Sequence, residues 1–148
     1  MRRLVLTTLA SMALIGCGGS GDDGTGETRV PGPTDTLVVF ARSGGIAGVR
    51  ERLAVRPDGA ARVERGGRAR RVQLTAAELQ RVRDAANAVD PDRLESRYGP
   101  ERPPADGFVM AVTAGGRTSQ VVSGGTPPAE LSRLMDVCAG LVQKYAPR

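Results

Sequence analysis

The sequence predicts an α+β domain in which two helices pack on one face of an antiparallel sheet. Short segments with alternating apolar and polar residues are separated by turns rich in Gly and Pro, which is typical of β-hairpins. Two longer segments, 75–90 and 126–145, carry apolar residues three and four positions apart, which indicates amphipathic helices. The expected order is β-β-β-α-β-β-α, with four to five strands, and hairpin connections make neighbouring strands antiparallel.

The first strands of the predicted sheet lie between residues 36 and 74. Residues 36–42 place apolar side chains on both faces, so this strand is expected near the middle of the sheet. Residues 46–56 alternate between an apolar face and an arginine face, which indicates one side in water. The apolar face holds Val49, Leu53 and Val55, and the other holds Arg50, Arg52 and Arg56. The remaining segments are a turn over 57–59, a strand over 60–64, a basic turn over 65–70 and an extension of the pairing over 71–74.

Both helices and a late hairpin follow in the second half of the domain. Thr75 and Glu78 have the spacing of a capping box, which begins a helix with the apolar stripe Leu79, Val82, Ala86 and Val89. Residues 91–106 are interpreted as irregular, and residues 108–112 and 117–122 as two strands of a hairpin. Thr126 is expected to cap the last helix and Pro127 to open it. Its stripe is Leu131, Leu134, Met135, Cys138, Leu141, Val142 and Tyr145.

The N-terminal residues are typical of an exported, lipid-anchored protein. Residues 1–16 combine two arginines with a short apolar run, which predicts a secretory signal peptide rather than a membrane-spanning helix. The ending Leu-Ile-Gly-Cys resembles a bacterial lipobox, in which Cys17 is lipidated and becomes the new N-terminus; the alternative is an ordinary signal with a chance cysteine. Residues 17–35 are rich in Gly, Asp, Thr and Pro and predict a flexible tether. The expected location is therefore the extracytoplasmic face of the cell membrane.

The composition excludes several kinds of active site. The chain contains no histidine, which excludes Ser-His-Asp and Cys-His sites and zinc sites that need imidazole. With Cys17 lipidated, Cys138 has no disulfide partner, and its place in an apolar stripe predicts a buried small hydrophobe. We therefore expect a binding protein rather than an enzyme, with no cofactor and no metal. Carboxylate catalysis stays formally open, although a solvated helix end is the favoured interpretation, for Asp84, Asp90, Asp92 and Glu95.

Charge divides unevenly along the chain. Residues 17–35 carry a net charge of −3, whereas residues 36–148, expected to form one domain, hold 18 Lys and Arg against 12 Asp and Glu. A basic surface of this kind fits an acidic partner or anionic lipid. Nucleic acid is not an expected partner, because the chain is predicted to be exported and its only aromatic residues are two Tyr and two Phe.

The segment Arg42-Ser43-Gly44-Gly45-Ile46-Ala47-Gly48 stands between the first two predicted strands. Its glycines permit positive φ angles, which suit a tight hairpin loop, and a purely mechanical turn is one interpretation. This segment resembles the opening of emfourin-like proteins. The resemblance covers residues 36–148 and includes the order of elements, the Asp106-Gly107-Phe108 entry to the late hairpin and the helix start at 126–134. The chain departs from that family by its lipoprotein signal and acidic tether.

Emfourin-like proteins inhibit thermolysin-like, protealysin-type zinc metallopeptidases. The resemblance implies an exported metallopeptidase of that class as the partner, blocked by a surface that includes residues 42–48. Ile46 would be its apolar anchor, and ordinary strand packing is the alternative role for this residue. A different function also stays open, in which the chain is a non-inhibitory lipoprotein module of the cell envelope that binds another protein or ligand.

Overall fold

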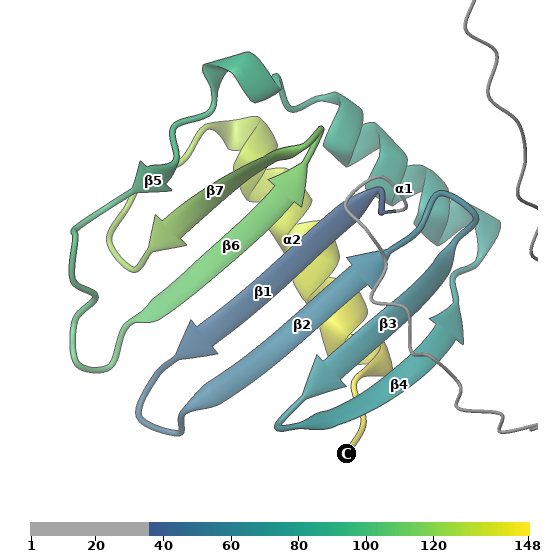
Figure 1. Cartoon of the computed structure of the whole chain (residues 1–148), viewed down its shortest axis with the longest axis horizontal. Coiled ribbons are helices and arrows are strands. Elements are labelled where there is room, and N and C mark those ends of the chain that lie inside the picture. The colour runs from purple at the N-terminus through teal and green to yellow at the C-terminus, as the bar shows by residue number, and fades with distance from the viewer. Residues whose placement is uncertain (1–35) are drawn as a thin grey trace, which may run out of the picture.

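Seven strands form one sheet, and two helices cover one of its faces (Figure 1). The computed structural model describes residues 36–148, so the predicted signal peptide, Cys17 and the 17–35 tether lie outside the described residues. The strands are β1 (Val38–Gly44), β2 (Val49–Val55), β3 (Ala60–Arg65), β4 (Arg68–Gln73), β5 (Arg97–Tyr98), β6 (Phe108–Ala114) and β7 (Arg117–Val122). The helices are α1 (Ala76–Asn87), the short 3-10 helix η2 (Pro91–Arg93) and α2 (Ala129–Tyr145). The predicted α+β class is confirmed.

The sheet has the order β4-β3-β2-β1-β6-β7-β5 and contains more strands than the sequence predicted. The predicted basic turn over 65–70 is wrong, because Gly66 and Gly67 alone make the turn and Arg68–Gln73 pairs with β3 as an edge strand. The stretch 91–106, predicted to be irregular, contains the strand β5. This strand pairs with β7 in parallel, so the sheet is mixed and not purely antiparallel. Neither strand shows apolar alternation, since β4 is mostly in water and β5 has only two residues.

The central position expected for the first strand is confirmed, because β1 lies between β2 and β6. Val38 and Phe40 are buried beneath the helices, while Val39 and Ala41 lie half-buried on the open face. The boundaries differ from the prediction: β1 continues to Gly44 and β2 begins at Val49, which leaves a four-residue turn. The outward arginine face of β2 is confirmed.

The predicted capping box of α1 is present, and the predicted apolar stripe of the helix lies against the core. The Glu78 N–H donates to Thr75 Oγ1 at 3.3 Å, and the Thr75 N–H donates to Glu78 Oε2 at 2.9 Å. The buried side chains of the helix are those of Glu78, Val82 and Ala85, whereas Leu79 is half-buried. Leu79 and Ala86 of the stripe pack against the core, and Glu78 directs its carboxylate at α2.

Helix α2 begins later than predicted. Its N-cap is Pro128, with no side-chain capping bond, so the predicted role of Thr126 as a cap is wrong. A proline disfavours helical backbone in the residue before it, and Pro127 is followed by Pro128, so the helix starts only at Ala129. The predicted apolar stripe is confirmed and lies across β2 and β3. Its buried members are Leu131, Leu134, Met135, Cys138, Leu141 and Val142.

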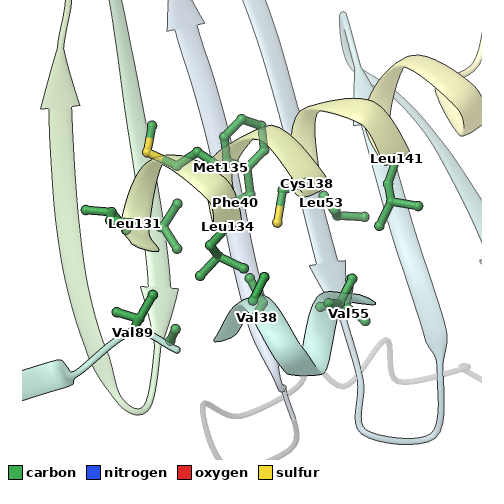
Figure 2. Close-up of a cluster of buried hydrophobic side chains, with 14 of the residues drawn as sticks. Val38, Phe40, Leu53, Val55, Val89, Leu131, Leu134, Met135, Cys138 and Leu141 are labelled. Carbon is green, nitrogen blue, oxygen red and sulfur yellow. The ribbon is translucent and has the colours of Figure 1, made fainter. Parts of the chain in front are cut away.

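The core lies between α2 and the inner face of the sheet. Figure 2 shows Leu134 and Cys138 of α2 in one cluster with Phe40 and Leu53 of the sheet, and all four are fully buried. Cys138 is fully buried, which confirms its expected place as a buried small hydrophobe, and this burial raises the pKa of its thiol to about 12. Residues 36–148 thus contain a complete core of their own.

Gly140 weakens α2 without an evident packing reason. It lies on the exposed side of the helix, and a Cβ built there meets no other atom within 4 Å. Because Gly in a helix interior costs about 0.5–1 kcal/mol relative to Ala, we expect Gly140→Ala to raise the free energy of unfolding by that amount. Urea denaturation checks this value, and a lower midpoint for the variant than for the wild type would contradict it.

Glu78 joins the two helices through a buried carboxylate. It accepts hydrogen bonds from Lys144 Nζ at 2.6 Å and from the Tyr145 hydroxyl at 3.0 Å. The Lys144 ammonium, with the Thr75 amide, lowers the pKa of Glu78 from 4.5 to about 2. The folded state therefore gains stability from this carboxylate above pH 4.5 and loses it as the pH falls from 4.5 to 2.

Replacing Glu78 with Gln tests that linkage. The variant loses hydrogen bonds to a charged group, so we expect its free energy of unfolding at pH 7 to fall by about 1.5–3 kcal/mol. The difference in the free energy of unfolding between variant and wild type should shrink as the pH falls from 4.5 to 2, because the wild-type carboxylate becomes protonated. Urea denaturation at several pH values measures it, and a difference independent of pH would contradict the assignment.

Candidate binding loop at the end of the sheet

The segment 42–48 forms the end of the β1–β2 hairpin. Arg42, Ser43 and Gly44 are the last residues of β1, and the residues Gly45, Ile46, Ala47 and Gly48 make the turn. The turn closes on itself, because the Gly48 N–H donates to the Gly45 carbonyl at 2.9 Å. The sequence prediction of a hairpin loop at this point is therefore confirmed.

Two glycines of the segment are required by close contacts with the neighbouring loop. Gly44 has a φ of 116°, and a Cβ there would lie 2.3 Å from the Gly107 carbonyl oxygen. At Gly45, with a φ of 71°, a Cβ would lie 2.7 Å from the ring of Phe108. Any other residue at position 44 would push the hairpin away from the Gly107 backbone, and one at position 45 would have to displace the Phe108 ring. The glycines thus fix the loop against a support and do more than allow a turn.

The support for the loop comes from Phe108 and its hydrogen bonds. The Gly45 N–H donates to the Gly107 carbonyl at 2.9 Å. The Phe108 N–H donates in turn to Ser123 Oγ at 2.7 Å, and the Ser123 N–H donates back to the Phe108 carbonyl at 2.9 Å. These bonds tie the loop to β6 and to the end of β7.

A buried ion cluster holds the same end of the sheet from its inner face. Glu51, 7% exposed, lies directly between Arg42 on β1 and Arg65 on β3. Its carboxylate accepts from Arg42 Nη2 at 2.7 Å and from Arg65 Nε at 2.8 Å. The Arg42 guanidinium also lies 5.4 Å from the centroid of the Phe108 ring, within range of a cation–π contact. The cluster therefore connects β1, β2, β3 and the support of the loop.

Sequence reasoning missed Glu51 and the supporting role of Phe108. Glu51 alternates with Leu53 and Val55, so the period-2 pattern already placed it on the inner face, where a lone carboxylate signals a charge partner. Arg42 was grouped with the contact residues, but its guanidinium is engaged with Glu51 and its side chain is 29% exposed. No sequence signal indicated the contact between Phe108 and Gly45, since 63 positions of chain separate them.

Ile46 is presented to solvent at the tip of this supported turn. Its side chain is 93% exposed, and within residues 36–148 it is the single exposed large apolar residue. Strand packing, the alternative role for this residue, is therefore wrong. Ala47 and Gly48 beside it are exposed as well.

A hollow of about 610 Å³ adjoins the loop. It lies between the β1–β2 and β3–β4 turns, and most of its wall is backbone, because four of the lining residues are glycines. The lining residues are Ser43, Gly44, Gly48, Val49, Arg50, Gly66 and Gly67.

The four carboxylates for which the sequence left catalysis open lie on the surface at the C-terminal end of α1 and just after it. Asp84 accepts from Gln80 on its own helix at 2.7 Å, and Asp90 caps the 3-10 helix through the Asp92 N–H at 3.0 Å. Glu95 is exposed. In the part of the chain that the structure describes, no three His, Cys, Asp or Glu residues come together in a way that could hold a metal ion.

The described helices are too short or too polar to cross a membrane. Comparison with models of protein families gives no match to the chain, and comparison with curated proteins gives no significant match either.

Proposed function

We propose that the chain is a lipid-anchored inhibitor of thermolysin-like, protealysin-type zinc metallopeptidases, held at the extracytoplasmic face of the membrane through Cys17. The β1–β2 turn enters the active-site cleft of the peptidase and blocks it. The observation that carries the proposal is Ile46, an isoleucine that is 93% exposed at the tip of a supported loop. An apolar side chain held out at the tip of a supported loop is free to enter an apolar subsite of a partner, where its burial contributes about 1.5–3 kcal/mol.

The support beneath the loop favours inhibition over simple attachment. An inhibitor that occupies a peptidase cleft must keep its backbone out of the cleavable geometry, and a loop already held in one conformation loses less entropy on binding. The Gly45–Gly107 hydrogen bond and the contact of Gly45 with Phe108 hold this loop before any partner arrives. Peptidases of this class accept a bulky apolar side chain beside the scissile bond, and Ile46 supplies one.

An inhibition titration tests the proposal. Residues 36–148, which contain the complete core, are titrated against thermolysin and against a protealysin-type peptidase with a quenched fluorescent peptide as substrate. Stoichiometric loss of activity supports the inhibitor function. No inhibition of either enzyme at micromolar protein, with the circular dichroism of a folded domain, would overturn it in favour of a non-inhibitory envelope module.

A further inference from the structure

The open face of the sheet carries a group of arginines that the proposed inhibitory loop does not use. Register places Arg50 and Arg52 of β2, Arg62 of β3 and Arg71 of β4 on the face opposite the helices. All four are exposed, and Figure 1 shows both helices behind this face. Glu64 is the single acidic residue of these three strands on the same face. We call Arg50, Arg52, Arg62 and Arg71 the arginine surface.

The charges of the arginine surface are largely uncompensated. Arg62 pairs with Glu64 at 2.6 Å, whereas Arg50, Arg52 and Arg71 form no ion pair with any of the described residues. Arg62 and Arg71 also stand directly opposite each other in the β3–β4 ladder. Like charges at directly opposite positions destabilise a sheet. An anion bound from solvent would therefore reduce the repulsion between Arg62 and Arg71.

Protection of the sheet edge does not explain the whole arginine surface. Charged side chains on an edge strand prevent pairing with other chains, and β4 is such an edge. That role requires charge on β4 alone. Arg50 and Arg52 stand on β2, the third strand from that edge, where both ladders are already occupied by β1 and β3. Edge protection therefore does not account for Arg50 and Arg52.

We propose that the arginine surface binds the phosphate headgroups of an anionic lipid bilayer. Between the arginines the face carries small residues such as Ala54 and Ala69, so it offers a broad low surface that suits a planar partner. Guanidinium groups form paired hydrogen bonds with phosphate oxygens, which favours arginine over lysine for this contact. Each arginine near an anionic bilayer raises the partition coefficient about fivefold.

The acidic residues of the 17–35 tether are the competing occupant. The segment has a net charge of −3, and the four arginines of the arginine surface would attract it. Fixing a chain segment over the sheet costs backbone entropy at every residue that is ordered, and an exposed ion pair returns little. A bilayer presents a dense array of phosphates without that cost, so lipid is the favoured occupant. This inference does not depend on the inhibitory function of the Ile46 loop.

Vesicle co-sedimentation tests the inference with the unacylated chain from Gly18 to Arg148. Vesicles contain either equal parts of phosphatidylglycerol and phosphatidylcholine or phosphatidylcholine alone. The test variant is Arg50→Gln/Arg52→Gln/Arg71→Gln. The control Arg81→Gln/Arg102→Gln/Arg133→Gln removes the same charge from exposed positions elsewhere. Thermal denaturation confirms that both variants are folded, and the test variant should not lose stability, because it removes one of two opposed arginines.

We expect the wild type to bind the anionic vesicles, not the phosphatidylcholine vesicles, and to be released by high salt. The test variant should lose about 100-fold in partition coefficient and the control less than about threefold. Equal losses in the two variants, or no binding by the wild type, would overturn the proposal. Binding by residues 36–148 but not by Gly18–Arg148 would also overturn it, since the acidic tether would then be the occupant.

Discussion

Replacing Ile46 with Asp is expected to raise the inhibition constant for the target metallopeptidase at least about 100-fold. Burying an isoleucine side chain contributes about 1.5–3 kcal/mol, and an aspartate carried into an apolar subsite adds the cost of a charge without a partner. Each 1.4 kcal/mol is tenfold in affinity. The free energy of unfolding should not change, because the Ile46 side chain is 93% exposed in the folded domain.

Inhibition assays and urea denaturation of Ile46→Asp separate binding from folding. Ala77→Asp is the matched control, because it adds the same charge at an exposed position in the first turn of α1, far from the loop in the fold. The control should inhibit like the wild type. An Ile46→Asp protein that is folded and still inhibits like the control would exclude Ile46 as the anchor.

Replacing Glu51 with Ala is expected to have the second largest effect, on stability and on inhibition together. The substitution leaves Arg42 and Arg65 facing each other across β2 without their shared carboxylate. Removing one partner of a fully buried ion pair costs about 3–5 kcal/mol. The two arginine side chains are 29% and 40% exposed, so water replaces part of the interaction. We therefore expect the free energy of unfolding to fall by about 2 kcal/mol.

Glu64→Ala provides the control for Glu51→Ala. Glu64 also accepts from an arginine, with 2.6 Å between Arg62 Nε and its carboxylate, but this pair lies in solvent and should contribute less than about 1 kcal/mol. Urea denaturation compares the two variants. Because Arg42 also contacts Phe108, inhibition should weaken in Glu51→Ala and not in Glu64→Ala. Equal effects of the two substitutions would show that the buried cluster does not position the loop.

The elements that the sequence predicted well are those whose own residues determine them. The apolar stripe of α2 and the capping box at Thr75 are local patterns, and both are present in the structure. The prediction reached only the second half of the edge strand β4, because a strand with both faces near water has no apolar alternation to detect. The burial of Glu78 in α1 was missed, because its pairing with Lys144 depends on how the two helices pack.

In the candidate site, too, the local features were predicted and the contacts between distant segments were not. The glycines of residues 44–48 predicted a hairpin loop, and their local chemistry was sufficient for that. The reason Gly44 and Gly45 must be glycine lies in Gly107 and Phe108, which reach the loop through the pairing of β1 with β6. A contact between segments so distant in the chain depends on strand order, which local periodicity does not determine.

Dependence of inhibition on substrate concentration tests the central claim most directly, namely that the loop carrying Ile46 occupies the active-site cleft. The apparent inhibition constant of residues 36–148 is measured for a protealysin-type peptidase at increasing concentrations of a peptide substrate. If the loop occupies the cleft, substrate and inhibitor compete. The apparent inhibition constant should then rise in proportion to the substrate concentration once the substrate saturates the enzyme. A constant that stays the same at all substrate concentrations would place the contact outside the cleft and contradict the account.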